Sequence, residues 1–174
     1  MNKKTQNWLG KPGDLANLVM LDLDYLPYQL LYDGKPVSAI RCHRLIASDL
    51  KQRLLNVWAA ARLEVKKIHG YNLTTAAYDS LTLELISDNN LNVYAGCYNY
   101  RPQRGSSKIS SHSWGAAIDF NPADNAIGTW GHMPRWFVSV WKQKIGSIRW
   151  VWGGSWLKIR KDPMHFEVDY LGRS

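Results

Sequence analysis

Apolar residues recur along the chain with two different periods, and these periods predict helices and strands. Between residues 43 and 70 they recur every three or four positions, as on one face of a helix: Leu50, Leu54, Trp58, Ala61, Val65 and Ile68. We therefore expect a core helix here, with Ser48 as its N-cap and Gly70 just beyond its C-terminal end. Arg53 falls on the opposite, polar face of this helix.

Three further helices are expected. Residues 75–87 carry apolar residues at helical spacing, although residues 81–85 also alternate like a strand, and we favour the helix. Pro134 suits the first turn of a helix over residues 135–145. Asp14 could cap a short helix over residues 15–20.

The strand predictions are residues 93–98, 117–120, 148–152 and 165–169. In the last of these, His165, Glu167 and Asp169 alternate with apolar residues and therefore share one face. Asp33-Gly34 lies between residues 28–32 and 35–41 and predicts a β-hairpin, because a type I′ turn needs two positive φ angles. Helices and antiparallel strands together indicate an α+β fold.

Two clusters of polar residues suggest metal chemistry. Residues 110–119 read S-x-H-x-x-G-x-A-x-D, and residues 162–167 read D-P-M-H-F-E. Together they offer two imidazoles and a carboxylate, and a catalytic zinc site uses three such ligands and leaves its fourth position to water. His43 and His69 lie in no such pattern, so we expect them at the surface or at helix caps. His132, in a Gly-rich loop, is the only rival ligand.

These motifs, with an acid three residues before the second histidine, resemble the LAS zinc peptidases. That family holds D-alanyl-D-alanine carboxypeptidases and dipeptidases, and L-alanyl-D-glutamate endopeptidases that include phage endolysins. Residues 97–101, 104–106, 120–122 and 150–156 resemble its endolysin-like branch. The resemblance covers roughly residues 40–170. It implies the LAS/hedgehog-type fold, in which a small central antiparallel sheet carries the zinc site and is flanked by helices.

The resemblance also implies the residues of the metal site. One zinc ion per chain would be held by His112, Asp119 and His165. Asp162 matches the catalytic acid/base, although many relatives have Glu there, and the Asp side chain is one methylene shorter. Glu167 is therefore the alternative acid; its other role would be to hold a ligand histidine by a hydrogen bond.

Further residues are candidates for substrate contacts. Arg101 matches the arginine that polarises the substrate carbonyl, and Ser110 matches the motif serine that contacts substrate. Arg104 could hold a carboxylate, and Trp152 and Trp156 lie in the Trp-rich matching segment.

Length and charge refine this interpretation. The 174 residues indicate a single peptidase domain, with an N-terminal extension (1–40) packed on a catalytic core (41–170). The net charge of +8 favours polyanions, and basic residues within 142–161 could guide anionic wall polymers; we expect no nucleic-acid partner. Cys42 and Cys97 are expected to be thiols. The printed sequence contains no run of about 18 apolar residues, the length of a membrane span.

Three functions remain open. The first is a zinc peptidase that cleaves a peptidoglycan stem peptide, as an endolysin-type L-alanyl-D-glutamate endopeptidase. The second is a D-alanyl-D-alanine carboxypeptidase, and the third is a non-catalytic module that binds cell wall or nucleic acid. We expect a monomer made in the cytoplasm without a signal peptide, which reaches the wall after lysis or as part of a virion.

Overall fold

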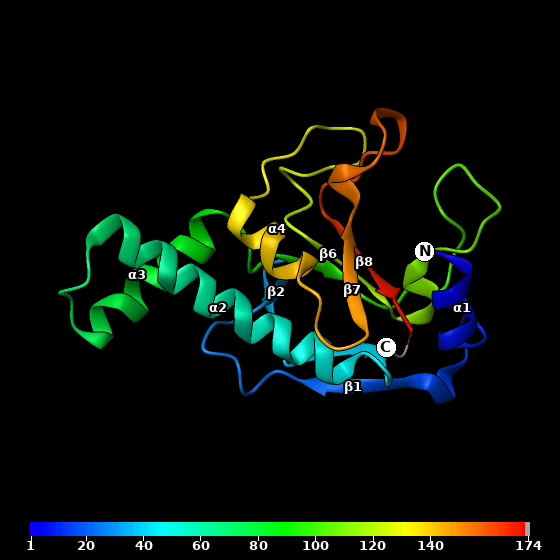
Figure 1. The fold of residues 1–174 in the computed structure, drawn as a ribbon, viewed down its shortest axis with the longest axis horizontal. Helices are drawn as coiled ribbons and strands as arrows, with labels where there is room; N and C mark the ends of the chain where they lie inside the picture. Colours follow the sequence, from blue (N-terminus) through cyan, green and yellow to red (C-terminus); the bar gives the residue numbers. More distant parts are fainter. Residues whose placement is uncertain (173–174) are drawn as a thin grey trace.

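A four-stranded antiparallel sheet with the order β5-β6-β8-β7 forms the centre of the molecule. A computed structural model describes residues 1–172 (Figure 1). The strands of this sheet are β5 (Tyr94–Gly96), β6 (Ala117–Phe120), β7 (Ile148–Trp152) and β8 (His165–Tyr170). Because side chains alternate along a strand, β6 and β8 direct their apolar residues to one face and their polar residues to the other.

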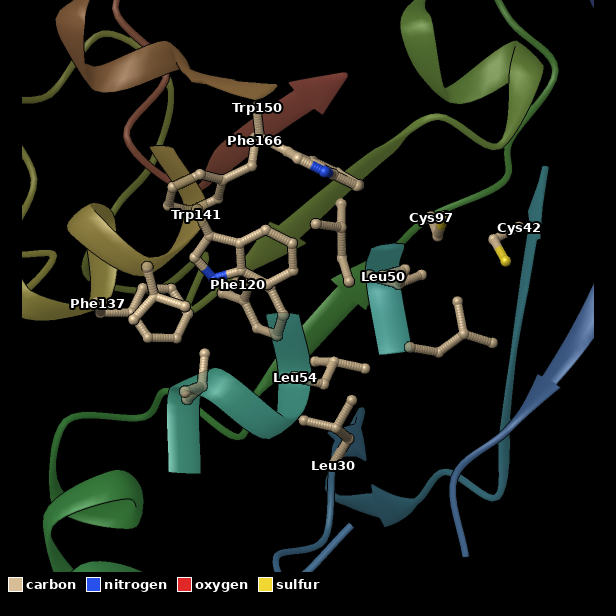
Figure 2. Packing of buried hydrophobic residues seen from close by; sticks show 14 of the residues in the cluster. Leu30, Cys42, Leu50, Leu54, Cys97, Phe120, Phe137, Trp141, Trp150 and Phe166 are labelled. Carbon is tan, nitrogen blue, oxygen red and sulfur yellow. The ribbon is translucent and has the colours of Figure 1, made fainter. Parts of the chain in front are cut away.

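Two helices cover the apolar face of this sheet. They are α2 (Ala47–His69) and α4 (Arg135–Lys142), which contact each other, and α4 also contacts β7 (Figure 1). Trp141 of α4 lies among aromatic rings from the sheet, with centroid distances of 5.1 Å to Trp150 and 5.3 Å to Phe166 (Figure 2). Helix α3 (Thr75–Asp88) packs on α2. This layer covers the apolar face of the sheet.

The N-terminal segment wraps around the sheet in short elements. These are α1 (Lys3–Leu9), β1 (Leu18–Asp22), β2 (Leu31–Tyr32), β3 (Lys35–Pro36) and β4 (Ala39–His43). Strand β1 pairs with β4, and β2 with β3. Helix α1 lies against β8, where Trp8 stacks on Tyr170 at a centroid distance of 4.3 Å. The described residues also form four 3-10 turns: η1 (Leu15–Asn17), η2 (Ser111–Trp114), η3 (Gly153–Ser155) and η4 (Lys158–Arg160).

The predicted α+β class is confirmed, with a small antiparallel sheet flanked by helices. The helices predicted over residues 75–87 and in the segment 48–70 are present as α3 and α2. Helix α4 begins after Pro134 as expected but ends at Lys142 rather than Ile145. The Asp33-Gly34 turn is also confirmed, with φ angles of 49° and 71°. The hairpin strands are shorter than predicted, because residues 39–43 pair with β1 instead.

The helix predicted over residues 15–20 is wrong beyond Asn17. Asp14 does act as a cap, and its carboxylate accepts a hydrogen bond from the Ala16 amide at 3.1 Å. From Leu18 onward the chain is extended and pairs with β4, with Leu18 opposite His43. Hydrogen bonds to a distant strand pair the backbone N–H and C=O groups that a helix would otherwise pair locally.

Two predictions within α2 are wrong. Ser48 is not the N-cap, because the helix begins at Ala47 after Ile46 and has no side-chain cap. Arg53 is fully buried instead of solvent-facing, with 0% of its surface exposed. Its guanidinium forms an ion pair with Asp49 and donates to the carbonyl oxygens of Val140, Trp141 and Gln143 at the end of α4. Carbonyls in the last turn of a helix lack intrahelical donors, and here the buried arginine supplies them.

His43 was expected at the surface or as a cap, and the surface position is wrong. The ring is buried, and its Nδ1 accepts a hydrogen bond from the Leu45 amide at 3.2 Å. Nε2 therefore carries the proton and donates to the Leu9 carbonyl at 3.0 Å. Cys42 and Cys97 are free and buried. Among the described residues, no helix combines the length and the apolar character that crossing a membrane requires.

Candidate metal centre

His112, Asp119 and His165 meet on the polar face of the sheet. One potential ligand atom from each lies within 4.8 Å of those of the other two. His165 Nδ1 is 2.9 Å from Asp119 Oδ1, and His112 Nε2 is 3.2 Å from His165 Nδ1 and 3.3 Å from Asp119 Oδ2. All three residues are buried. The two predicted motifs, which are far apart in the sequence, therefore form one cluster.

The sheet register and one tight turn create this cluster. Asp119 on β6 is the cross-strand partner of His165 on β8, so their side chains project side by side. His112 lies on η2. The side-chain oxygen of its N-cap, Ser110, accepts a hydrogen bond from the His112 amide at 3.4 Å. Gly115 then ends η2 with a φ of 62°, and a Cβ there would lie 3.0 Å from the His43 nitrogen. The motif glycine is thus required by both conformation and space.

The free nitrogen of each histidine points to the same small region. His112 Nδ1 is 2.8 Å from the Cys97 carbonyl oxygen, which can only accept, so Nδ1 carries the proton and Nε2 is left as a ligand atom. His165 Nε2 lies 3.4 Å from a Glu167 oxygen and 3.3 Å from Ser111 Oγ, which leaves Nδ1 for a metal. Two oriented imidazoles and one carboxylate match the ligand set of zinc, and each imidazole has the outer hydrogen-bond partner typical of such sites.

The cluster is strongly coupled electrostatically. Burial alone would raise the pKa of Asp119, but its close contacts with the imidazoles of His112 and His165 outweigh burial and hold the pKa well below its usual value. Burial would lower the pKa of His165, yet Asp119 and Glu167 raise it to about 10. Burial opposes ionisation of Glu167 as well, but His165 and the amino group of Met1, with which Glu167 forms an ion pair, lower its pKa to about 2. Without a metal the site therefore holds a proton on His165 between two carboxylates.

The cluster lies in a cavity of about 990 Å³, called the main cleft here. Its lining includes Asp162, Arg101, Arg104, Ser110 and Trp156, together with the cluster and Glu167. Trp152 does not line it; its indole N–H instead donates to the Pro163 carbonyl at 2.7 Å. His132, the rival ligand, is exposed and lies outside the cluster.

Asp162 differs from the other acids of the cleft. Its Oδ1 is buried and has no hydrogen-bond partner among the described residues. Burial raises the pKa of this carboxyl group above its ordinary value. The Asp162 amide donates to the Gly153 carbonyl at 3.1 Å, and a Cβ on Gly153 would lie 2.4 Å from the Asp162 carbonyl oxygen. The Gly-Gly turn after β7 thus allows the loop that carries Asp162 to approach closely.

Comparison with known proteins gives one match. Residues 104–168 match a family model described as D-alanyl-D-alanine carboxypeptidase. No curated protein and no solved structure matches the chain. The matched segment contains His112, Asp119, Asp162 and His165, whereas Arg101 and the N-terminal elements lie outside it. The match and the cluster together support a metallopeptidase of the zinc type.

Two contacts of the centre were not anticipated from the sequence. Ser111, inside the first motif, places its Oγ near His165 Nε2, and the motif spacing could have indicated this residue. The amino group of Met1 pairs with Glu167, and this contact has no sequence signal, because it depends on how α1 packs along β8.

Proposed function

We propose that the chain is a zinc-dependent peptidoglycan peptidase that cleaves a stem peptide at its L-alanyl-D-glutamate bond. The observation that carries this proposal is a buried carboxyl oxygen of Asp162 that has no hydrogen-bond partner among residues 1–172, in the same cleft as the cluster of His112, Asp119 and His165. The family match supports the peptidase class, and the endolysin-like motifs favour an internal bond. Zinc at such a site would lower the pKa of a bound water toward about 7 and polarise the scissile carbonyl.

Asp162 is a better proton acceptor than Glu167. Both oxygens of Glu167 are engaged, one by Met1 and the other by His165, and its lowered pKa makes it a weak base. Asp162 has an oxygen that accepts no hydrogen bond from the described residues, and its raised pKa brings it closer to the neutral range in which acid/base catalysis is efficient. In this proposal Asp162 accepts the proton of the attacking water and returns it to the leaving amine, while Glu167 orients His165.

Arg101 is assigned to the carbonyl oxygen of the substrate. Its backbone is fixed to η2, because the Arg101 amide donates to Ser113 Oγ at 3.0 Å and its carbonyl accepts from the Ser110 amide at 3.1 Å. The side chain lines the main cleft, where its planar donors can face a developing oxyanion. Loss of one such donor typically lowers the rate by about 10²–10³. We place Ser110, Arg104 and Trp156 among the substrate contacts for the same reason, since each lines the cleft.

A second candidate function is D-alanyl-D-alanine carboxypeptidase, which the description of the matching family favours. Such an enzyme needs a cation for the terminal carboxylate, and Arg104 in the main cleft could supply it. A non-catalytic wall binder is disfavoured, because binding alone does not require a buried acid of raised pKa beside a metal site.

Mass spectrometry of peptidoglycan digests distinguishes these functions. The zinc-loaded chain should release stem peptides that begin at D-glutamate and leave L-alanine on the glycan. Release of single D-alanine residues would assign the carboxypeptidase instead, and undigested material would contradict both. Asp162→Asn is the matched control, because it should bind zinc as the unmodified chain does and yet release no fragment.

The wall itself remains the proposed partner of the basic stretch at residues 142–161. Trp150 within this stretch is buried in the core, and Arg149 forms an ion pair with Asp169. Lys142, Lys144 and Arg160 are exposed and could guide anionic wall polymers. Since peptidoglycan lies outside the cytoplasm, we propose that the chain meets it after lysis or as a virion component.

A further inference from the structure

A second hollow, of about 550 Å³, adjoins the main cleft at the metal centre. His112 and Asp119 line both spaces, so the two meet beside the candidate ligands. Ala95, Asn99 and Arg101 also line both. Asp162 and His165 line only the main cleft. The second hollow therefore adjoins the main cleft at the cluster and lies between β5 and the N-terminal hairpin.

The far wall of this hollow comes mainly from the N-terminal extension. It is formed by the β2–β3 hairpin and the start of β4, including Tyr32, Lys35 and Arg41. The hairpin is attached to the edge of the sheet by the Leu31 amide, which donates to the Asn92 carbonyl at 2.8 Å. Tyr32 and Tyr94 also pack with ring centroids 6.0 Å apart. We call this space, between β5 and residues 32–41, the hairpin arm.

The lining of the hairpin arm is cationic and aromatic. Lys35, Arg41 and Arg101 contribute positive charge, and Asp119, the one acid in the lining, is engaged by the two histidines. Lys35 and Arg41 are exposed, and neither forms an ion pair within residues 1–172. The space next to Gly96 is free of other atoms, because an added Cβ there would meet no atom within 4 Å. Aromatic rings beside unpaired cations suit a ligand that carries carboxylates along an extended chain.

We propose that the hairpin arm binds the carboxylate-bearing part of the substrate on one side of the scissile bond, while the main cleft binds the other side. This inference rests on the proposed function and narrows it. Two hollows that adjoin at the reacting centre can accommodate both sides of a bond within a longer chain, whereas a carboxypeptidase needs an extended cleft on one side only. Residues 32–41, outside the segment that matches the family model, thus contribute to specificity.

The test reverses the charge of the arm and measures binding. The double variant Lys35→Glu/Arg41→Glu is compared with the double variant Lys51→Glu/Lys67→Glu. Lys51 and Lys67 are exposed lysines of α2 that line neither space. Both pairs change the net charge equally. Each is made in the Asp162→Asn background, so that purified peptidoglycan is bound and not digested, and binding is measured by cosedimentation. Thermal unfolding of each variant verifies that it is folded.

The arm pair should weaken binding about fivefold or more, and the α2 pair less than about twofold. The difference should shrink at about 0.5 M salt, because exposed charges are then screened. A milder pair, Lys35→Gln with Arg41→Gln, should show a smaller loss in the same direction. Equal binding by the arm pair and the α2 pair overturns the inference. Failure of the unmodified chain to digest peptidoglycan overturns the proposed enzyme instead, since binding would still report on the arm.

Discussion

Metal binding at the cluster should be strongly pH-dependent, because the metal competes with a proton on His165. Asp119 and Glu167 raise the pKa of this imidazole to about 10 when no metal is present. The group is therefore protonated at pH 7, and Nδ1 must lose that proton before it can bind a metal. The apparent affinity of the site for the metal therefore falls as pH falls. Asp119 does not add to this dependence near neutrality, since its pKa is lowered and it is already ionised.

The magnitude follows from the distance between this pKa and the working pH. A pKa of about 10 lies three units above pH 7, which weakens the apparent affinity about a thousandfold, or roughly 4 kcal/mol, relative to a deprotonated site. Between pH 6 and 9 the affinity should rise about tenfold per unit. Close to one proton should leave His165 for each zinc bound at pH 7.

Isothermal titration calorimetry in buffers of different ionisation enthalpy measures the protons released. Glu167→Gln removes one of the two carboxylates that raise the His165 pKa, so proton release at pH 8 should fall below that of the unmodified chain. Asp169→Asn is the matched control: it removes an acid from the same face of β8 that pairs with Arg149, and it should leave proton release unchanged. Proton release near zero from the unmodified chain at pH 7, with a flat affinity from pH 6 to 9, would refute the reasoning.

Three other outcomes are expected. His112→Ala should lose stoichiometric zinc, whereas Asp162→Asn should keep zinc and lose at least about 10² in kcat, both read from metal analysis and peptide release. Arg53→Met should reduce the free energy of unfolding by about 3–5 kcal/mol in urea titrations, because it leaves the buried Asp49 carboxylate without its ion-pair partner; a loss below about 1 kcal/mol would contradict this. Gly115→Ala should lower both stability and zinc affinity, since its φ of 62° and a Cβ 3.0 Å from the His43 nitrogen force η2 to move; unchanged zinc affinity would contradict it.

The features that could be predicted from the sequence are those that depend on local periodicity. The stripe of apolar residues gave α2 with Leu50, Leu54, Ala61 and Val65 buried, because a helix repeats its contacts every three or four positions. The strands β6, β7 and β8 were predicted for the same reason. The motif spacing indicated His112, Asp119 and His165, and the structure brings them into one cluster.

What could not be predicted depends on contacts between distant segments. Residues 18–20 belong to the helix predicted over residues 15–20, and only the pairing with β4 makes them part of a strand. Arg53 occupies a polar position of α2, yet the carbonyls at the end of α4 make its burial favourable. The hairpin arm likewise has no local signal, because it exists only where β2 is bridged to the residues before β5.

The zinc content and coordination of the purified chain test the central claim most directly. Metal analysis with zinc-edge X-ray absorption should find one zinc per chain, with nitrogen and oxygen neighbours at about 2.0–2.2 Å and no sulfur. The buried thiols support this, since burial raises the pKa of Cys42 to about 12 and disfavours the thiolate that zinc requires. A chain that retains no zinc after loading, or one whose zinc has sulfur ligands or survives His112→Ala, would contradict the account.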